Sequence, residues 1–521
     1  MSDKLPPICA LFLTKFDVHT GYELKWFRSI EDSLYSSSDL EFKSIPSGLH
    51  AVSTDTVCFV KHKQNLEDLI YGISIFKQNN HLQQIDDTGT IDRDKVKMYS
   101  LGVLVDPKHL EGLDDYKDWE PKIYSVCWNY RIKLSQLLGN FMSLQNEQQE
   151  SDYFKQFDSF FNNHAQTKAI LPTNATKLLP PLRPVDSKSS LASLLYDSEI
   201  QNDHMIDPLI TFFNSLGPLI FKIWKISLLR KSIVIYCPHT TSPIIMDDTG
   251  EVKHENFDIG DLSKFLFCIS LISAIPKDLE IQLKRSTKGS KLNLFFNRPV
   301  FNVSVNDIYH LVQLEKNYLA STTDQILVEK QNLFDYSIRL PLKSSPNNET
   351  IPEVKNMAKN RIELASPRDY ERYKIIYSKL NNTNQEPAIA SKVSENSSIQ
   401  ELAWKGLAWW ATAGDSFKSV HDEFNIEFEY FDNLANDEVE KIVTLIGYFQ
   451  QLTIKLFSGI IELVVKCEND ILILTAHDIE ELGLNPYCNS DCEFLIELVK
   501  TWWNKEVRIG SYINELCYWN S

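Results

Sequence analysis

Glycine is scarce in this chain, where it occupies 17 of 521 positions. Neither a P-loop nor a Gly-x-Gly-x-x-Gly turn occurs, so the sequence has no recognisable loop whose backbone N–H groups could surround a phosphate. The Gly-x-Ser-x-Gly turn that presents a nucleophilic serine is missing as well. These absences argue against the common nucleotide-binding enzymes and against serine hydrolases of the α/β type.

Cysteines are few and scattered singly along the chain. There are nine, an odd number without a paired spacing, which predicts reduced thiols in a cytosolic setting. Cys488 and Cys492 lie four residues apart with His477 upstream, but a zinc site needs further ligands at close spacing, and none follows. We therefore expect neither a metal ion nor another cofactor.

Long uninterrupted hydrophobic runs are also missing. The most apolar stretches, 209–229 and 443–465, contain lysines such as Lys222 and Lys455, which are costly at the centre of a bilayer. The start of the chain is polar and lacks the features of a secretory signal. We expect a cytoplasmic protein without a transmembrane segment, whose membrane contact, if any, is peripheral on an endomembrane or organelle surface.

Negative charge dominates over positive charge. The formal net charge is −17, so the surface would repel the phosphates of a nucleic acid, and we expect no nucleic-acid partner. With 43% hydrophobic and 24% charged residues, the composition is that of an ordinary globular protein. A chain of this length exceeds what one core supports, so several domains are expected.

Residues 1–142 are predicted to form a first α/β domain. Runs rich in Val, Ile, Tyr and Phe predict strands, and apolar residues three and four apart predict a long amphipathic helix. Gly21 lies in a turn that would join the first two strands as a hairpin. The expected strands are 8–16, 22–26, 56–61, 71–77 and 98–105, and the expected helix is 119–142.

Four further segments follow. Residues 143–203 are rich in Gln, Pro and Ser, which predicts a partly disordered linker with one helix at 152–164. Residues 204–342 predict a central α/β module, and residues 401–521 predict a mostly helical module. Between them, the polar residues 343–400 predict a flexible insert with a helix at 367–380. In the central module we expect helices at 205–213, 218–229 and 262–275, and strands at 232–237, 291–296 and 301–305; in the last, helices at 402–413, 437–457 and 493–504.

Residues with chemical potential are isolated from one another. His239 follows a predicted strand, but no nucleophile lies beside it, so a polar loop histidine is the simpler interpretation. Trp404, Trp409 and Trp410 are spaced as on one helix, which favours packing over a ligand-binding cage. No catalytic residue is identified from this pattern, and whether the chain is an enzyme stays open.

Several motifs nevertheless occur in the order found in one known family. The pattern Phe16-Asp17-x-x-x-Gly21-x-x-Leu24-x-Trp26 resembles the opening of LCHN-type DENN proteins, and Leu216-Gly217-Pro218 resembles the start of their central module. The C-terminal motif resembles that of Avl-type relatives. The residues that carry the resemblance are Asp17, Gly21, Trp26, Pro46, Gly48, Gly102, Gly217, Pro218, Trp224, Arg230, Asp307, Asp324, Leu482 and Gly483.

The resemblance implies both a fold and a function. The expected fold is mixed α/β: a longin-like α/β sandwich, then a DENN core made of an α/β module and a C-terminal helical module. The expected function is regulation of a Rab-type small GTPase in membrane trafficking, as a guanine-nucleotide exchange factor or adaptor at an internal membrane. Such an activity works by preferential binding to one state of the GTPase and needs no acid, base or metal of its own.

Two alternatives stay open within the same family. A GTPase-activating protein of this kind supplies an arginine from the loop before the last longin strand, and Arg93 occupies that place here. Its neighbours Asp92 and Asp94 would weaken its field, and a solvated loop arginine is the plainer interpretation. The other alternative is a non-enzymatic scaffold whose longin-like sheet pairs with another longin domain.

Overall fold

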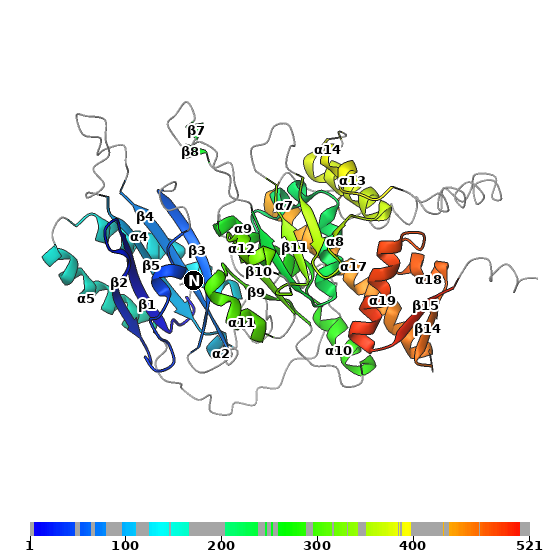
Figure 1. The fold of residues 1–521 in the computed structure, drawn as a ribbon, viewed down its shortest axis with the longest axis horizontal. Helices are drawn as coiled ribbons and strands as arrows, with labels where there is room; N and C mark the ends of the chain where they lie inside the picture. The colour runs from blue at the N-terminus through cyan, green and yellow to red at the C-terminus, as the bar shows by residue number, and fades with distance from the viewer. Residues whose placement is uncertain are drawn as a thin grey trace, which may run out of the picture.

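Two β-sheets with helices packed around them make up most of this mixed α/β protein (Figure 1). The fold is given by a computed structural model of the chain. It describes residues 5–46, 53–63, 68–79, 96–110, 124–144, 147–165, 204–237, 245–246, 252–253, 259–287, 295–314, 317–330, 332–341, 351–383, 385, 388–396, 431, 437–467 and 469–510.

The first sheet has five antiparallel strands in the order β2-β1-β5-β4-β3. All five strands expected from the sequence are present. Gly21 has a φ of 84°, which allows the tight turn between the first two strands. The strands are β1 (Ala10–Asp17), β2 (Gly21–Ser29), β3 (Thr54–His62), β4 (Leu69–Gln78) and β5 (Met98–Val105).

Helices cover one face of this sheet, and their bounds correct two expectations. The helix expected over 119–142 is, within the described residues, a 3₁₀ turn η4 (Val126–Tyr130) followed by α4 (Arg131–Met142). The helix expected at 152–164 begins earlier, as α5 (Glu147–His164). It is no linker, because the ring of Trp26 lies 5.5 Å from that of Phe157 and joins α5 to the sheet.

Gly102 illustrates how tightly the first sheet is packed. A Cβ atom at this position would lie 2.3 Å from Cζ of Phe12 and 2.7 Å from the carbonyl oxygen of Ile73. The backbone carbonyl cannot rotate away, so we expect Gly102→Ala to lower the free energy of unfolding by about 1–3 kcal/mol in urea denaturation.

The matched control is Gly447→Ala in α17 (Glu438–Lys466), where a Cβ meets nothing within 4 Å. There the substitution should raise stability by about 0.5–1 kcal/mol, because alanine loses less backbone freedom in a helix. Equal effects of the two substitutions would contradict the packing argument.

The second sheet has six strands in the order β13-β12-β11-β6-β10-β9. Neighbouring strands β11, β6, β10 and β9 are parallel. At the other edge, β12 pairs antiparallel with β11, and β13 pairs antiparallel with β12. The strands are β6 (Ser232–Tyr236), β9 (Arg298–Val300), β10 (Tyr318–Thr322), β11 (Tyr336–Arg339), β12 (Glu353–Asn356) and β13 (Arg361–Glu363). Strands expected at 301–305 and, in its described part, at 291–296 are wrong: one short strand, β9, lies between them.

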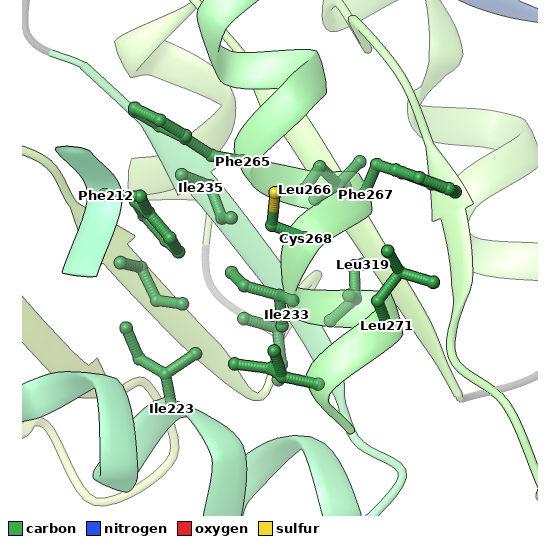
Figure 2. Close-up of a cluster of buried hydrophobic side chains, with 14 of the residues drawn as sticks. Phe212, Ile223, Ile233, Ile235, Phe265, Leu266, Phe267, Cys268, Leu271 and Leu319 are labelled. Atoms are coloured by element: carbon green, nitrogen blue, oxygen red, sulfur yellow. The ribbon is translucent and has the colours of Figure 1, made fainter. Parts of the chain in front are cut away.

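Three apolar helices pack against this sheet. They are α7 (Leu209–Leu216), α8 (Leu219–Leu228) and α9 (Ile259–Ile272), close to the expected positions. Figure 2 shows side chains from all three helices meeting Ile233, Ile235 and Leu319 of β6 and β10. Among the described residues no single helix could cross a membrane by length and apolarity; α7 and α8 meet that standard only as a pair bent by 107°.

Residues 343–400 are not the flexible insert that their polarity predicts. Within the described part they provide β12 and β13 of the second sheet, then α13 (Pro367–Asn381) and α14 (Ala388–Lys392). Several of the polar residues in this segment are buried and make specific contacts. Lys225 of α8 donates to Asp369 of α13 at 2.5 Å and to Asp491 at 2.6 Å. Ion pairs therefore hold α13 against α8.

The C-terminal part combines helices with a small sheet. The helices are α17, α18 (Ala476–Glu481) and α19 (Asn489–Trp503). Two strands that the sequence pattern did not reveal, β14 (Ile471–Leu474) and β15 (Glu506–Ile509), pair in parallel. The helix expected at 402–413 lies outside the described residues.

Candidate functional site

The two sheets meet at a junction between β3 and β4 on one side and β9 and α9 on the other (Figure 1). Tyr71 of β4 is 1% exposed, and its hydroxyl donates to the carbonyl oxygen of Pro299 at 2.8 Å. The ring of Tyr71 also lies edge-on to Phe301, 6.0 Å away. These buried contacts pack the first sheet directly against the second.

Asp307 joins a local turn to this junction. It ends the 3₁₀ turn η6 (Val305–Asp307), where its carboxylate accepts from the backbone N–H of Ser304 at 2.9 Å in a capping box. The same carboxylate accepts from Nζ of Lys43 at 2.6 Å, and both side chains are mostly buried. Lys43 is the last residue of helix α1 (Leu40–Lys43), which packs on the first sheet. This ion pair therefore links the two modules.

Two histidines stack across the junction beside this ion pair. His62 of β3 and His310 of α11 (Ile308–Gln313) have ring centroids 3.9 Å apart, inclined by 19°. Burial, and then the neighbouring His310, Lys43 and Lys61, lowers the pKa of His62 to about 4, against the opposing effect of Asp307. The stacked pair therefore prefers a neutral His62.

This arrangement predicts a pH effect on stability. The unfolded chain protonates His62 near its ordinary pKa of about 6.5, whereas the folded chain resists protonation down to about 4. The unfolded state thus binds more protons within this window, and stability is lost as pH falls from 6.5 toward 4. We expect His62→Asn to flatten this part of a urea-denaturation profile by roughly 1–2 kcal/mol.

The control for that profile is His477→Asn, because His477 is a largely exposed histidine that lies 3.4 Å from Glu481 on its own helix. Its substitution should leave the pH dependence between 4 and 6.5 unchanged. If His62→Asn behaves like the control, the buried stack does not resist protonation.

Exposed aromatic and aliphatic side chains lie on the two segments that the Lys43–Asp307 pair joins, α1 and the η6–α11 segment. Phe42 directly precedes Lys43 in α1, and its ring centroid lies 5.4 Å from that of Tyr22 in β2, the strand at the opposite edge of the first sheet from β3. Across that pair, η6 and α11 carry three apolar residues spaced four and three apart, as on one helical face. The junction stripe consists of Tyr22 (37% exposed), Phe42 (53%), Val305 (42%), Tyr309 (69%) and Val312 (70%).

An exposed apolar surface of this kind is typical of protein-binding sites. Its residues come from both modules, so a partner that covers the stripe contacts both at once. Asp307, which the resemblance identified, pairs with Lys43 and so links the two modules that carry the stripe. Such a surface can bind a protein through its apolar and phenolic side chains.

The other motif residues that the structure describes lie elsewhere, mostly at corners of the chain. Gly217 has a φ of 61° between α7 and α8, and Pro218 is the N-cap of α8. Trp224 donates from Nε1 to Oγ1 of Thr453 at 3.0 Å and joins α8 to α17. Asp324 caps α12 (Gln325–Glu329) by accepting from the backbone N–H of Ile326.

Arg230 is the most constrained of these corner residues. It has a φ of 56° after α8, and its guanidinium donates to the carbonyl oxygens of Ser227, Ser273 and Phe295 at 3.1–3.2 Å. Burial lowers the pKa of Arg230 to about 9. Its role is to satisfy carbonyl groups near the ends of two helices where the second sheet begins.

Four other motif residues also have structural roles. Asp17 accepts from the backbone N–H groups of its own turn, and Pro46 is buried. Gly483 has a φ of 80°, and its carbonyl oxygen accepts from Arg372 at 2.9 Å. Leu482 packs so closely on Gly459 that a Cβ there would lie 2.6 Å from Leu482 Cδ2.

Three expected residues, Gly48, Arg93 and His239, lie outside the described residues. Within the described ranges, no group of three or more His, Cys, Asp or Glu side chains could hold a metal ion. The described motif residues are therefore dispersed; Gly21 directly precedes Tyr22 of the junction stripe, and Asp307 pairs with Lys43 between the two modules. The stripe itself was missed by sequence reasoning, because six-residue α11 is too short to show a periodic apolar face.

Comparisons with known proteins place this architecture in a class. A profile of the family described as DENN domain-containing protein 11 matches residues 11–350. The chain is thus a DENN-domain protein, as its motifs predicted. It belongs to the DENN domain-containing protein 11 family.

Individual relatives agree with this assignment. The Saccharomyces cerevisiae protein called "Uncharacterized protein ANR2" is 27% identical over 97% of this chain and 93% of its own length. A Danio rerio protein named DENN domain-containing protein 11 is 23% identical over 64% of this chain and 53% of its own length. An uncharacterized Schizosaccharomyces pombe protein is 21% identical over 97% of this chain and 94% of its own.

Proposed function

We propose that this chain regulates a Rab-type small GTPase and acts as a guanine-nucleotide exchange factor on the surface of an internal membrane. The observation that carries the proposal is the junction stripe, whose residues come from both modules. Membership of a DENN family supports the choice of partner. The GTPase would lie across the stripe and contact the longin-like first module and the central DENN module together.

Exchange by this route is a matter of differential affinity. A surface that binds the nucleotide-free GTPase better than the GDP-bound form shifts the population toward nucleotide release. The side chains of the stripe are apolar or phenolic, so they can bind a rearranged loop without taking part in bond cleavage. The buried Lys43–Asp307 pair keeps both halves in register, which limits the ordering cost of binding.

A release assay tests this proposal. The full chain is mixed with each member of a panel of Rab GTPases loaded with fluorescent GDP, with and without excess unlabelled nucleotide. We expect release from one or a few members to accelerate by at least about tenfold, equivalent to roughly 1.4 kcal/mol of differential binding. No acceleration for any member would rule out the exchange activity.

The same panel separates the alternatives. Faster GTP hydrolysis that disappears in Arg93→Ala would identify a GTPase-activating protein instead. Stable complex formation with unchanged release and hydrolysis would identify a scaffold. Each result leaves the family assignment intact and replaces only the proposed activity.

A further inference from the structure

An exposed serine of the first module covers a nearly buried cation. Ser38 lies in the segment between β2 and α1 and is exposed, whereas Lys61 of β3 is 5% exposed. Nζ of Lys61 donates to Oγ of Ser38 at 3.1 Å, and it also donates to the backbone carbonyl oxygen of Ser38. One residue thus supplies both oxygens that this ammonium group contacts.

Lys61 has no carboxylate in contact. Within the part of the chain that the structure describes, no carboxylate oxygen lies within 4.0 Å of its Nζ. Burial lowers the pKa of Lys61 to about 8, and the more distant carboxylates of Asp39, Glu41 and Asp307 do not restore it. Buried lysines are rare unless they are paired with an opposite charge. The ammonium group therefore lacks a negative partner at contact distance.

The sequence around Ser38 has a pattern that the local fold does not use. A serine three residues before a glutamate commonly caps a helix, and Ser38 stands three residues before Glu41. Here α1 begins one residue later, after Asp39 at a φ of 62°, and no side chain caps it. Kinases select substrates partly by charge pattern, and carboxylates one and three residues after a serine suit an acidophilic serine kinase. Asp39 and Glu41 occupy those two positions.

We propose that Ser38 is a phosphorylation site, and that its phosphate is the counter-ion that Lys61 lacks. A protein kinase transfers the γ-phosphoryl group of ATP to Oγ. The bond from the γ-phosphorus to the β–γ bridging oxygen breaks, an Oγ–P bond forms, ADP leaves, and the hydroxyl proton passes to solvent. The product carries a charge of about −1.5 to −2 and three acceptor oxygens. Because Oγ already lies 3.1 Å from Nζ, these oxygens can contact the ammonium group where it stands.

The first experiment asks whether the folded chain is a substrate. The full chain is incubated with ATP, Mg²⁺ and casein kinase 2, an acidophilic serine kinase, and the modified positions are located by mass spectrometry. Ser33 is the matched control, because it is exposed in the same segment, donates to Glu31 and has no acid one or three residues after it. We expect phosphorylation at Ser38 to be at least about tenfold faster than at Ser33, since two carboxylates assist recognition. Modification confined to other serines would overturn the proposal.

The second experiment tests the contact with Lys61 and needs no kinase. Phosphoserine is encoded genetically at position 38 of the full chain, and the second ionisation of its phosphate is followed by ³¹P NMR. An ammonium group in contact favours the dianion. We therefore expect the phosphate pKa to be lower by about 1 in the chain with Lys61 than in Lys61→Gln, which keeps an N–H donor for the carbonyl oxygen of Ser38. Lys61→Arg retains the charge and should retain the low value.

Phosphoserine at position 33 is the control for this titration. Its neighbour is Glu31, so its phosphate pKa should be the same with Lys61 and in Lys61→Gln. The proposal is overturned if the pKa at position 38 is equally insensitive to Lys61→Gln, even where the kinase modifies Ser38. Both experiments use the chain alone, so their outcome does not depend on the GTPase.

Discussion

Replacing Lys225 with methionine should cost the protein about 3–5 kcal/mol of stability, the expected effect of removing one partner from a buried ion pair. Its Nζ lies 2.5 Å from Oδ2 of Asp369 and 2.6 Å from Oδ1 of Asp491, and each of the three side chains is at most 2% exposed. Without the ammonium group, two carboxylates would remain buried side by side. Urea denaturation of the full chain measures the loss.

The matched control is Lys231→Met. Lys231 pairs with Glu497 at 2.6 Å, but these side chains are 26% and 40% exposed, so the loss should stay below about 1 kcal/mol. Combining Lys225→Met with Asp491→Asn should recover much of the stability, because Asp369 then keeps the buried Arg372, 4.0 Å away, as its partner. A loss for Lys225→Met no larger than that of the control would contradict the importance of burial.

Titration adds a second signature of this triad. Burial alone raises the pKa of Asp491, but Lys225 outweighs it and holds the pKa below its ordinary value. In the native protein this contribution is present above about pH 4 and is lost as the carboxylate is protonated at lower pH. Lys225→Met removes the largest effect that opposes burial, leaving the backbone N–H of Asn485 and the charge of Lys222, so the pKa of Asp491 rises and the destabilisation should shrink on acidification from pH 7 to about 5.

Buried charges such as Asp369 also explain why the prediction of a flexible insert at residues 343–400 is wrong. A polar segment is usually solvated, but the buried face of α13 includes Asp369 and Arg372 beside Tyr373. These charges are satisfied by residues from α8 and from the turn near Gly483, which are more than 100 positions away in the sequence. Local composition cannot reveal such partners, so the segment was predicted to be flexible although it completes the second sheet.

Elements with strong local signals were predicted more successfully. The strands of the first sheet carry dense β-branched and aromatic residues, and Gly21 marks their hairpin. The long amphipathic α17 was expected as well, although it ends nine residues later than predicted, at Lys466 rather than residue 457. By contrast, β14 and β15 are four residues each and pair across a whole helix, so neither signals its partner locally.

The candidate site was the part of the structure that the sequence predicted least. The motifs identified the family, but most motif residues stabilise turns between helices and strands, as Arg230 and Gly217 do. The junction stripe arises only when α1 and α11, 264 residues apart at the Lys43–Asp307 pair, are brought together. Exposed apolar residues carry no helical or strand period of their own in segments this short.

Truncating the stripe on either module should therefore weaken the stimulation of GDP release from the GTPase without unfolding the protein. Phe42 and Tyr309 are 53% and 69% exposed, so Phe42→Ala and Tyr309→Ala should change stability by no more than about 0.5 kcal/mol. If each anchors the GTPase, each should raise the chain concentration needed for half-maximal stimulation of GDP release by about 30-fold, the equivalent of a hot-spot loss of roughly 2 kcal/mol. The release assay with the responsive Rab measures both variants.

Each module offers its own exposed apolar control. Ile132→Ala on α4 and Ile326→Ala on α12 remove side chains that are 47% and 69% exposed but do not belong to the stripe. Neither should alter GDP release. If only the variant on one module slows release, the GTPase binds that module alone. If the controls slow release as much as Phe42→Ala and Tyr309→Ala do, the partner binds elsewhere, and a surface that spans both sheets is not what the activity requires.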